Sequence, residues 1–276
     1  MTIVKDKGMN QTILVTGGTS GLGLELVHIF LRQGYSVVTT GRQQVNMQGF
    51  DDKFDLYNVD FKDLKEVAEV TKRICRDHSV SFIVNNAGIL SPPEYIETIN
   101  GLEYTFQINF LAHLLINNII LDGMIDGQQM RIASVTSPVH RYASFNPGIR
   151  SGLADYRAMR SYSSSKLYLT MMCELLACRH KDLNLHCFSF DPGTFSSGIY
   201  RMQKRWFREM YGIAAPFMRR PASAAKALAE LLLDDNVVDG MIYDRLKRLR
   251  SLPDIDKSQK ESFMDSCNAL IDPFLN

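Results

Sequence analysis

The sequence has little of what marks a secreted, metal-binding or nucleic-acid-binding protein. Its 276 residues include five cysteines, an odd number, with no C-x-x-C pair of the kind found in zinc and redox sites. We therefore expect a reducing compartment, the cytoplasm, and no metal site. Lys and Arg number 31 against 30 Asp and Glu, a formal net charge of +1. This balance provides no general attraction for polyanions, so we expect no nucleic-acid partner.

Long apolar runs are also missing. The most apolar stretch, residues 110–121, is interrupted by one histidine and two asparagines. It is far shorter than the roughly 20 residues that a transmembrane helix needs. Residues 1–11 are polar and lack the apolar segment of a secretory signal. We expect a soluble protein without a transmembrane segment.

Short β-branched runs alternate with helix-length segments along most of the chain. This rhythm predicts strands at 12–16, 36–40, 55–59, 81–85, 130–135, 185–190 and 241–243, and helices at 21–33, 63–76, 101–124, 162–180 and 222–234. Strands joined by helical crossovers run parallel, and right-handed connections place helices on both faces of the sheet. We therefore predict a doubly wound, Rossmann-type α/β fold in a single domain, 1–276, with ligands at the carboxyl ends of the strands.

A glycine-rich turn follows the first predicted strand. The segment from Thr16 to Gly23 reads T-G-G-T-S-G-L-G, and apolar residues at helical spacing come directly after it. Glycines allow a tight turn and close approach of the backbone, while a helix N-terminus presents unpaired N–H groups to a pyrophosphate. The alternative is an ordinary glycine-rich loop. Its position between a strand and an amphipathic helix favours dinucleotide binding.

Tyr162 and Lys166 are four residues apart and lie on one face of a predicted helix. A free phenol has a pKa near 10, and a neighbouring ammonium lowers it by favouring the phenolate. The pair therefore predicts an acid–base site. A surface aromatic beside a solvated lysine is the alternative interpretation. His113 and His140 have no ligand spacing, and we interpret both as structural.

Several motifs occur together and in one order between Thr16 and about Ser197. The first glycine motif has the spacing T-G-x-x-x-G-x-G. The others are Asn85-Asn86-Ala87-Gly88, Asn109, Ser137, Tyr162 with Lys166, and Pro192-Gly193. Taken together, they resemble the short-chain dehydrogenase/reductase family. The resemblance implies an NAD(P)-dependent oxidoreductase that moves a hydride between a nicotinamide and a carbonyl or alcohol.

The resemblance also assigns catalytic roles. It implies that Tyr162 supplies the proton in the reducing direction, that Lys166 assists it, and that Asn109 holds a water molecule on the proton path. Ser137 is implied as the donor to the substrate oxygen. Ser134 and Thr136 compete with Ser137 for that role.

The expected cofactor is NADP, with NADPH favoured over NADH. Arg42 follows the second strand, and no carboxylate appears before Asp51, so a 2′-phosphate meets a cation rather than an anion. The alternative interpretation of Arg42 is a loop cation that contacts only solvent. Ser197 aligns better than Thr194 with the family residue that faces the carboxamide. The full predicted cofactor set is Gly17, Thr19, Ser20, Gly21, Leu22, Gly23, Arg42, Asp60, Asn86, Ala87, Gly88, Tyr162, Lys166, Pro192, Gly193 and Ser197.

Two segments resemble the branch of retinol dehydrogenases and protochlorophyllide reductases, although a retinoid substrate is not implied. They are the interval between Ser137 and Tyr162, with Arg141, Tyr142 and Phe145, and the segment Asn109-Phe-Leu-Ala-His113. Residues 200–220 combine cationic and aromatic side chains. This composition fits a lid within 194–220 over a bulky, apolar or anionic substrate, or a surface that binds a membrane or a carrier protein. The alternative is an ordinary amphipathic helix that packs on the sheet. The expected partner is a small molecule with a carbonyl or alcohol group, and the sequence is also compatible with a homo-oligomer. A nucleotide-sensing module without redox activity, and a lyase or epimerase, remain as alternative functions.

Overall fold

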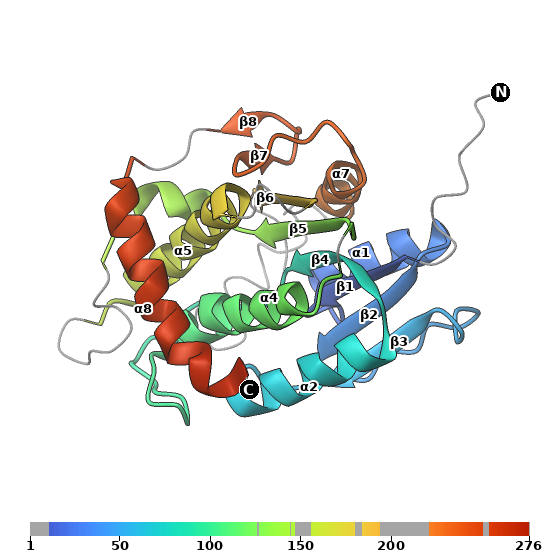
Figure 1. Cartoon of the computed structure of the whole chain (residues 1–276), viewed down its shortest axis with the longest axis horizontal. Coiled ribbons are helices and arrows are strands. Elements are labelled where there is room, and N and C mark those ends of the chain that lie inside the picture. The colour runs from blue at the N-terminus through green and yellow to red at the C-terminus, as the bar shows by residue number, and fades with distance from the viewer. Residues whose placement is uncertain are drawn as a thin grey trace, which may run out of the picture.

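The centre of the molecule is one eight-stranded sheet with the strand order β3-β2-β1-β4-β5-β6-β7-β8 (Figure 1). The computed structural model describes residues 11–125, 127–143, 145–146, 156–179, 184–193, 221–250 and 254–275. Neighbouring strands are parallel except for β7 and β8, which are antiparallel. The strands are β1 Thr12–Thr16, β2 Ser36–Gly41, β3 Phe54–Asn58, β4 Val80–Asn85, β5 Met130–Val135, β6 Leu185–Asp191, β7 Ile242–Asp244 and β8 Leu249–Arg250.

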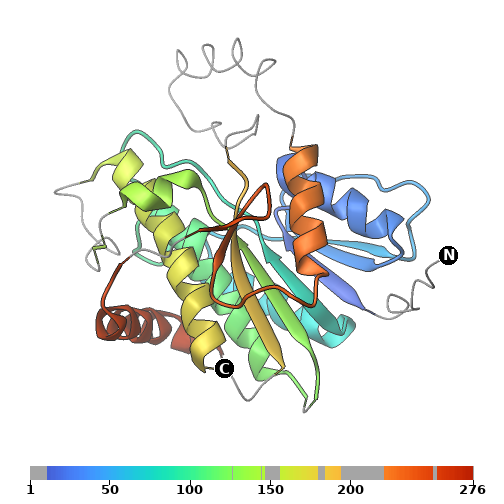
Figure 2. The same cartoon turned by 90° about the horizontal axis from the view of Figure 1, so that it is seen from above.

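Helices cover both faces of this sheet. On one face α1 and α7 pack together, as Figure 2 shows, while α2, α4 and α5 cover the other. Helix α8 packs outside α2, α4 and α5. No helix in these described stretches is long and apolar enough to cross a membrane. The helices are α1 Gly21–Arg32, α2 Leu64–Asp77, α3 Tyr104–Phe106, the π-helical turn η1 Gln107–Leu111, α4 Ala112–Asp122, the 3₁₀ turn η2 Pro138–Tyr142, α5 Ala158–Arg179, α7 Ala222–Leu232 and α8 Lys257–Leu275.

The doubly wound α/β prediction is confirmed, and each of the seven predicted strands is present. Strand β1 is buried at all five positions, as expected for a parallel strand with helices on both faces. The chain order reverses between β1 and β4, and the connections leave these two strands in opposite directions. In open α/β sheets a ligand binds at such a switch point, outside the carboxyl ends of the strands.

The structure adds three elements that the sequence rhythm did not predict, the 3₁₀ turn η2, the strand β8 and the helix α8. It also divides the predicted helix 101–124 into α3, η1 and α4. A π-helical turn inside an α-helix inserts one extra residue per turn, and such turns are frequent at functional sites. Asn109 lies in this turn.

Candidate active site

The turn after β1 is shaped by its glycines. Gly17 and Gly21 have φ values of 67° and 56°, in the left-handed region that favours glycine. A Cβ on Gly23 would lie 2.5 Å from both Asn86 Nδ2 and Gly17 O. Helix α1 begins at Gly21, and its N-cap residue Ser20 makes no side-chain capping hydrogen bond. The first N–H groups of α1 are therefore available to an anion, and the turn fits a pyrophosphate.

We predict that Gly23→Ala destabilises this turn. The added methyl group has no space against Asn86 Nδ2 and Gly17 O, and we expect a loss of about 1–3 kcal/mol in the free energy of unfolding. Cofactor affinity is expected to fall with it. Gly123→Ala is the matched control, because its Cβ would lie 3.7 Å from the nearest atoms. Denaturant unfolding and titration with NADPH measure both effects, and equal results for the two variants would contradict the prediction.

The segment after β4 is fixed against the end of β1. The Thr16 hydroxyl accepts hydrogen bonds from the backbone N–H groups of Asn86 and Ala87, at 2.9 and 3.0 Å. The Asn86 amide group donates to Thr16 O at 2.8 Å. The predicted cofactor residues Asn86 to Gly88 therefore lie directly beside the glycine turn, at the switch point of the sheet.

Tyr162 and Lys166 lie on α5, and both side chains are buried. Lys166 Nζ lies 6.0 Å from the centroid of the Tyr162 ring, and it donates to Val135 O, at the end of β5, at 2.9 Å. A Cβ on Gly88 would lie 3.3 Å from Asn109 Oδ1 and 3.4 Å from Lys166 Nζ. The structure thus brings Gly88, Asn109, Tyr162 and Lys166 together at the carboxyl ends of β4 and β5.

Burial changes the acidity of Lys166. It lowers the pKa of this ammonium from 10.5 to about 8, because a charged group is poorly solvated there. A pKa near 8 lets the lysine release and regain a proton close to neutral pH. The group therefore suits a proton path that serves an acid–base tyrosine.

Asn109 joins two elements of the site. Its Oδ1 accepts from Ile89 N at 2.8 Å, and its Nδ2 donates to Ile89 O at 2.9 Å and to Ser165 Oγ at 3.0 Å. Ser165 in turn donates to Tyr162 O. The asparagine thereby connects the segment after β4 to the helix that carries the tyrosine.

Three residues with hydroxyl groups lie at the end of β5 or directly after it, Ser134, Thr136 and Ser137, and their surroundings differ. Ser134 is fully buried, and its Oγ accepts from Asn85 Nδ2 at 3.0 Å. Thr136 is also buried, and its hydroxyl donates to Lys166 O at 3.0 Å. Ser137 is half-buried. Ser134 and Thr136 thus make hydrogen bonds inside the protein, whereas Ser137 is the most accessible of the three residues.

Arg42 and Asp60 lie near one another at the outer end of the site. The Arg42 side chain is 61% exposed, and its Nη1 lies 3.7 Å from Asp60 Oδ2. Lys62 Nζ lies 3.5 Å from the same oxygen. Two cations thus lie beside the Asp60 carboxylate, and the Glu66 carboxylate accepts from Asp60 N at 3.3 Å.

The remaining predicted residues fall at the end of β6. Pro192 and Gly193 follow Asp191, whose Oδ1 accepts from Gly193 N at 2.9 Å. Ser197, and the predicted lid over 194–220, lie outside the described residues.

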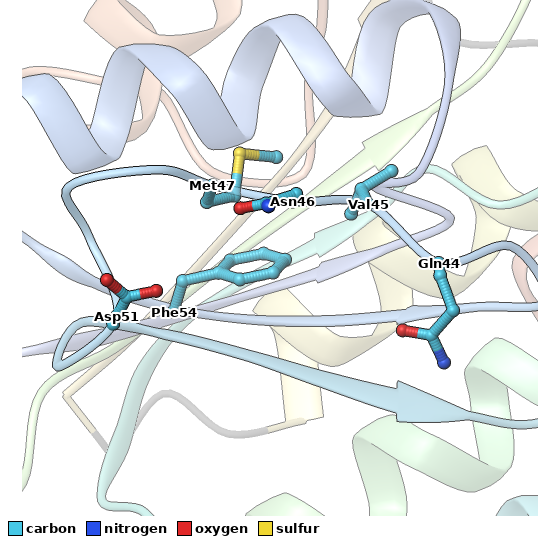
Figure 3. A pocket seen from close by; sticks show the side chains of 6 residues that line it. All are labelled: Gln44, Val45, Asn46, Met47, Asp51 and Phe54. Carbon is cyan, nitrogen blue, oxygen red and sulfur yellow. The ribbon is translucent and has the colours of Figure 1, made fainter.

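Two hollows of the described part lie apart from the predicted site residues. Figure 3 shows a pocket of about 400 Å³ along the connection between β2 and β3, lined by Gln44, Val45, Asn46, Met47, Asp51 and Phe54. A groove of about 960 Å³ lies between α2, α4, α5 and α8. Neither of these two is lined by a predicted site residue.

Sequence reasoning missed the roles of Thr16 and His113. The Thr16 hydroxyl holds the segment after β4, and His113 Nε2 lies 3.0 Å from that hydroxyl. The sequence signals for His113 are its place four residues after Asn109, on the same side of the helix, and its place in the segment Asn109-Phe-Leu-Ala-His113 that resembles the retinol dehydrogenase branch.

Comparisons with known proteins identify the family of the chain. The family model described as short chain dehydrogenase matches residues 11–207. Human retinol dehydrogenase 11 is 24% identical over 246 residues, which cover 82% of this chain and 74% of that protein. This likeness agrees with the predicted retinol dehydrogenase branch.

Solved structures share the fold. A 3-ketoacyl-(acyl-carrier-protein) reductase from Brucella melitensis, complexed with NADH, superposes with a TM-score of 0.63 at 19% identity, covering 85% of this chain and 96% of that chain. ElxO with NADP bound gives a TM-score of 0.65 at 18% identity, covering 86% of this chain and 97% of that chain.

Proposed function

This chain belongs to the short-chain dehydrogenase/reductase family of oxidoreductases, and from that premise we propose that it is an NADP-dependent carbonyl reductase or alcohol dehydrogenase. The observation that carries the proposal is the position of Lys166. Its ammonium is buried 6.0 Å from the Tyr162 ring and is fixed by the carbonyl at the end of β5. An ammonium in this place stabilises the phenolate and makes the tyrosine an acid or base at neutral pH.

In the reducing direction, the Tyr162 hydroxyl gives its proton to the substrate oxygen. Ser137 donates a hydrogen bond to the same oxygen and stabilises the negative charge that develops there. Lys166 then returns a proton toward the tyrosine, along a path that Asn109 orders. When bound, the nicotinamide supplies or accepts the hydride. Gly23 and the open N–H groups of α1 fit its pyrophosphate.

The preference for NADP rests on Arg42. We predict that Arg42→Ala raises the Kd for NADPH about ten- to a hundredfold, because a charge-assisted contact to the 2′-phosphate is lost, and leaves the Kd for NADH nearly unchanged. Lys62→Ala is the control, since Lys62 is a second exposed cation beside Asp60. We expect its effect on NADPH to be smaller. Fluorescence titration of both nucleotides measures the ratio, and an unchanged NADPH-to-NADH preference would refute the role of Arg42.

The proposed activity is tested by oxidation of NADPH and NADH with a panel of aldehydes, ketones and quinones. We expect stoichiometric loss of NADPH with at least one carbonyl. Net oxidation separates a reductase from a lyase or epimerase, which returns the hydride to its product. Binding of nucleotide without turnover of any substrate would favour a sensing module, and failure to bind either nucleotide would refute the proposal.

The wider proposal concerns the substrate and the setting. Retinol dehydrogenase 11 is named for a bulky apolar alcohol, and a bulky or apolar carbonyl or alcohol is the substrate class that we propose here. We also propose that the described elements act as one domain and that the protein acts in the cytoplasm.

A further inference from the structure

A fully buried histidine, His113, lies between the glycine turn and the catalytic residues. Its Nε2 lies 3.0 Å from the Thr16 hydroxyl at the end of β1. Its Nδ1 lies 3.1 Å from the backbone carbonyl of Asn109, one helical turn earlier. The ring packs edge-on against Phe61 with a centroid distance of 5.4 Å. Both ring nitrogens therefore have a hydrogen-bonding partner, although the side chain is fully buried.

These contacts determine the tautomer of His113. The carbonyl of Asn109 only accepts, so Nδ1 carries the proton and donates it. The Thr16 hydroxyl already accepts from Asn86 N and Ala87 N, which uses both of its lone pairs. Its own proton has two acceptors within reach, His113 Nε2 at 3.0 Å and Val84 O at 3.3 Å. With the ring proton on Nδ1, Nε2 needs a donor, and as the nearer acceptor it takes the Thr16 proton.

The neutral state agrees with the surroundings. Burial and, secondarily, the positive charge of Lys166 on α5 lower the pKa of His113 to about 3. The imidazole stays uncharged at working pH and adds no second positive charge near Lys166. It therefore acts through its two hydrogen bonds and not by exchanging protons.

The two partners of His113 serve different parts of the proposed site. Thr16 holds the backbone of Asn86 and Ala87, in the segment predicted to contact the cofactor. Asn109 holds Ser165, which donates to the backbone of Tyr162. One imidazole thus touches the supports of the cofactor-binding segment on one side and of the acid–base pair on the other.

We propose that His113 is a positioning residue with two separable functions: Nε2 fixes Thr16 and thereby the cofactor-binding segment, while Nδ1 fixes Asn109 and thereby the Tyr162–Lys166 pair. This inference rests on the proposed function and deepens it. It assigns to His113 a role beyond filling space in the core.

Two neutral substitutions separate the two halves. The amide nitrogen of asparagine matches the position of Nδ1, so His113→Asn keeps a donor for Asn109 O and loses the acceptor for Thr16. The longer glutamine places an amide oxygen near the position of Nε2, so His113→Gln keeps the acceptor for Thr16 and loses the donor for Asn109 O. Neither variant changes the charge near Lys166.

We expect opposite kinetic signatures from the two variants. His113→Asn raises the Kd for NADPH about tenfold, the worth of one hydrogen bond, with a decrease in kcat of less than about threefold. His113→Gln lowers kcat at saturating NADPH about tenfold, with a change in Kd of less than about threefold. Fluorescence titration with NADPH and steady-state turnover give the two quantities, and thermal unfolding shows whether each variant is folded.

Parallel losses of affinity and kcat in both variants would overturn the proposal and leave His113 as a packing residue. If either variant does not fold, Thr16→Ala replaces it as the test, because this substitution removes the hydroxyl that contacts His113 Nε2. We expect Thr16→Ala to raise the Kd for NADPH by a larger factor than that by which it lowers kcat. Equal effects of Thr16→Ala on both would also overturn the proposal. Wild-type protein that neither binds nor oxidises NADPH would instead refute the proposed function, so the two failures are distinguishable.

Discussion

Tyr162→Phe is expected to lower kcat by about a hundred- to ten-thousandfold, with little change in the Kd for NADPH. The substitution removes one oxygen atom, the proton donor of the proposed reaction. The ring is buried on α5, and phenylalanine fills the same space. Rapid-quench or steady-state turnover gives kcat, and fluorescence titration gives the affinity for NADPH.

Tyr57→Phe provides the matched control for this variant. Tyr57 lies on β3, and its hydroxyl donates to Asp77 Oδ2 at 3.0 Å, away from α5. We expect normal turnover and a loss of at most about 1 kcal/mol in the free energy of unfolding. A Tyr162→Phe protein with turnover close to that of Tyr57→Phe would eliminate the acid–base role of Tyr162.

Lys166→Met is expected to lower kcat/KM for NADPH by about a hundredfold or more. The substitution keeps an apolar stem of similar length and removes the ammonium that stabilises the phenolate. Because kcat/KM reports groups of the free enzyme, and the pKa of Lys166 is about 8, the wild-type value should fall as the pH rises above about 8. This fall should be absent from the remaining activity of the variant, and its persistence there would assign the titration to another group.

Stability gives a second test of Lys166, with a defined sign. Its pKa is lower in the folded protein, about 8, than the ordinary value of 10.5, so burial of the ammonium costs stability. The cost is complete below pH 8. Between pH 8 and 10.5 the folded state releases the proton while the unfolded state keeps it, so stability rises with pH. The free energy of unfolding of cofactor-free wild type, relative to Lys166→Met, should therefore increase by up to about 3 kcal/mol across this window.

Lys260→Met is the control for a buried lysine outside the site. Lys260 Nζ donates to Glu174 at 2.8 and 2.9 Å, and the pair links α8 to α5. Removing the lysine leaves the carboxylate of Glu174 without this partner, so we expect lower stability. Turnover should stay close to the wild-type value. Loss of turnover in Lys260→Met equal to that in Lys166→Met would show that the latter effect is not specific to the site.

Local patterns were sufficient to predict much of the fold. Five of the seven predicted strands, β1, β2, β4, β5 and β6, are buried at most positions, as parallel strands with helices on both faces are, and their apolar signal lies within five to seven consecutive residues. The strand β8 has two residues, one of them exposed, and provides no such signal. Helix α8 buries Phe263, Met264, Cys267 and Ile271 at helical spacing, but polar residues around them weaken the pattern.

The boundaries of α5 show where local reasoning was insufficient. The sequence predicted a helix from residue 162, whereas α5 begins at Ala158, so that Tyr162 lies within the second turn of the helix. The π-helical turn at Asn109 had no local signal either. Both features depend on how the helices pack on the sheet.

The sequence by itself determined the glycine turn, the order of strands and helices, and the common helix face of Tyr162 and Lys166, because each depends on backbone preferences and on spacing within a few residues. The tertiary structure decided which residues from other elements contact these groups. It buried Lys166 beside the carbonyl of Val135, and it engaged Ser134 and Thr136 inside the protein while leaving Ser137 half-buried. It also placed His113 between Thr16 and Asn109. Apart from the Asn109–His113 contact within one helix, these contacts join residues 30 to 97 positions apart, a separation over which sequence spacing carries no geometric information.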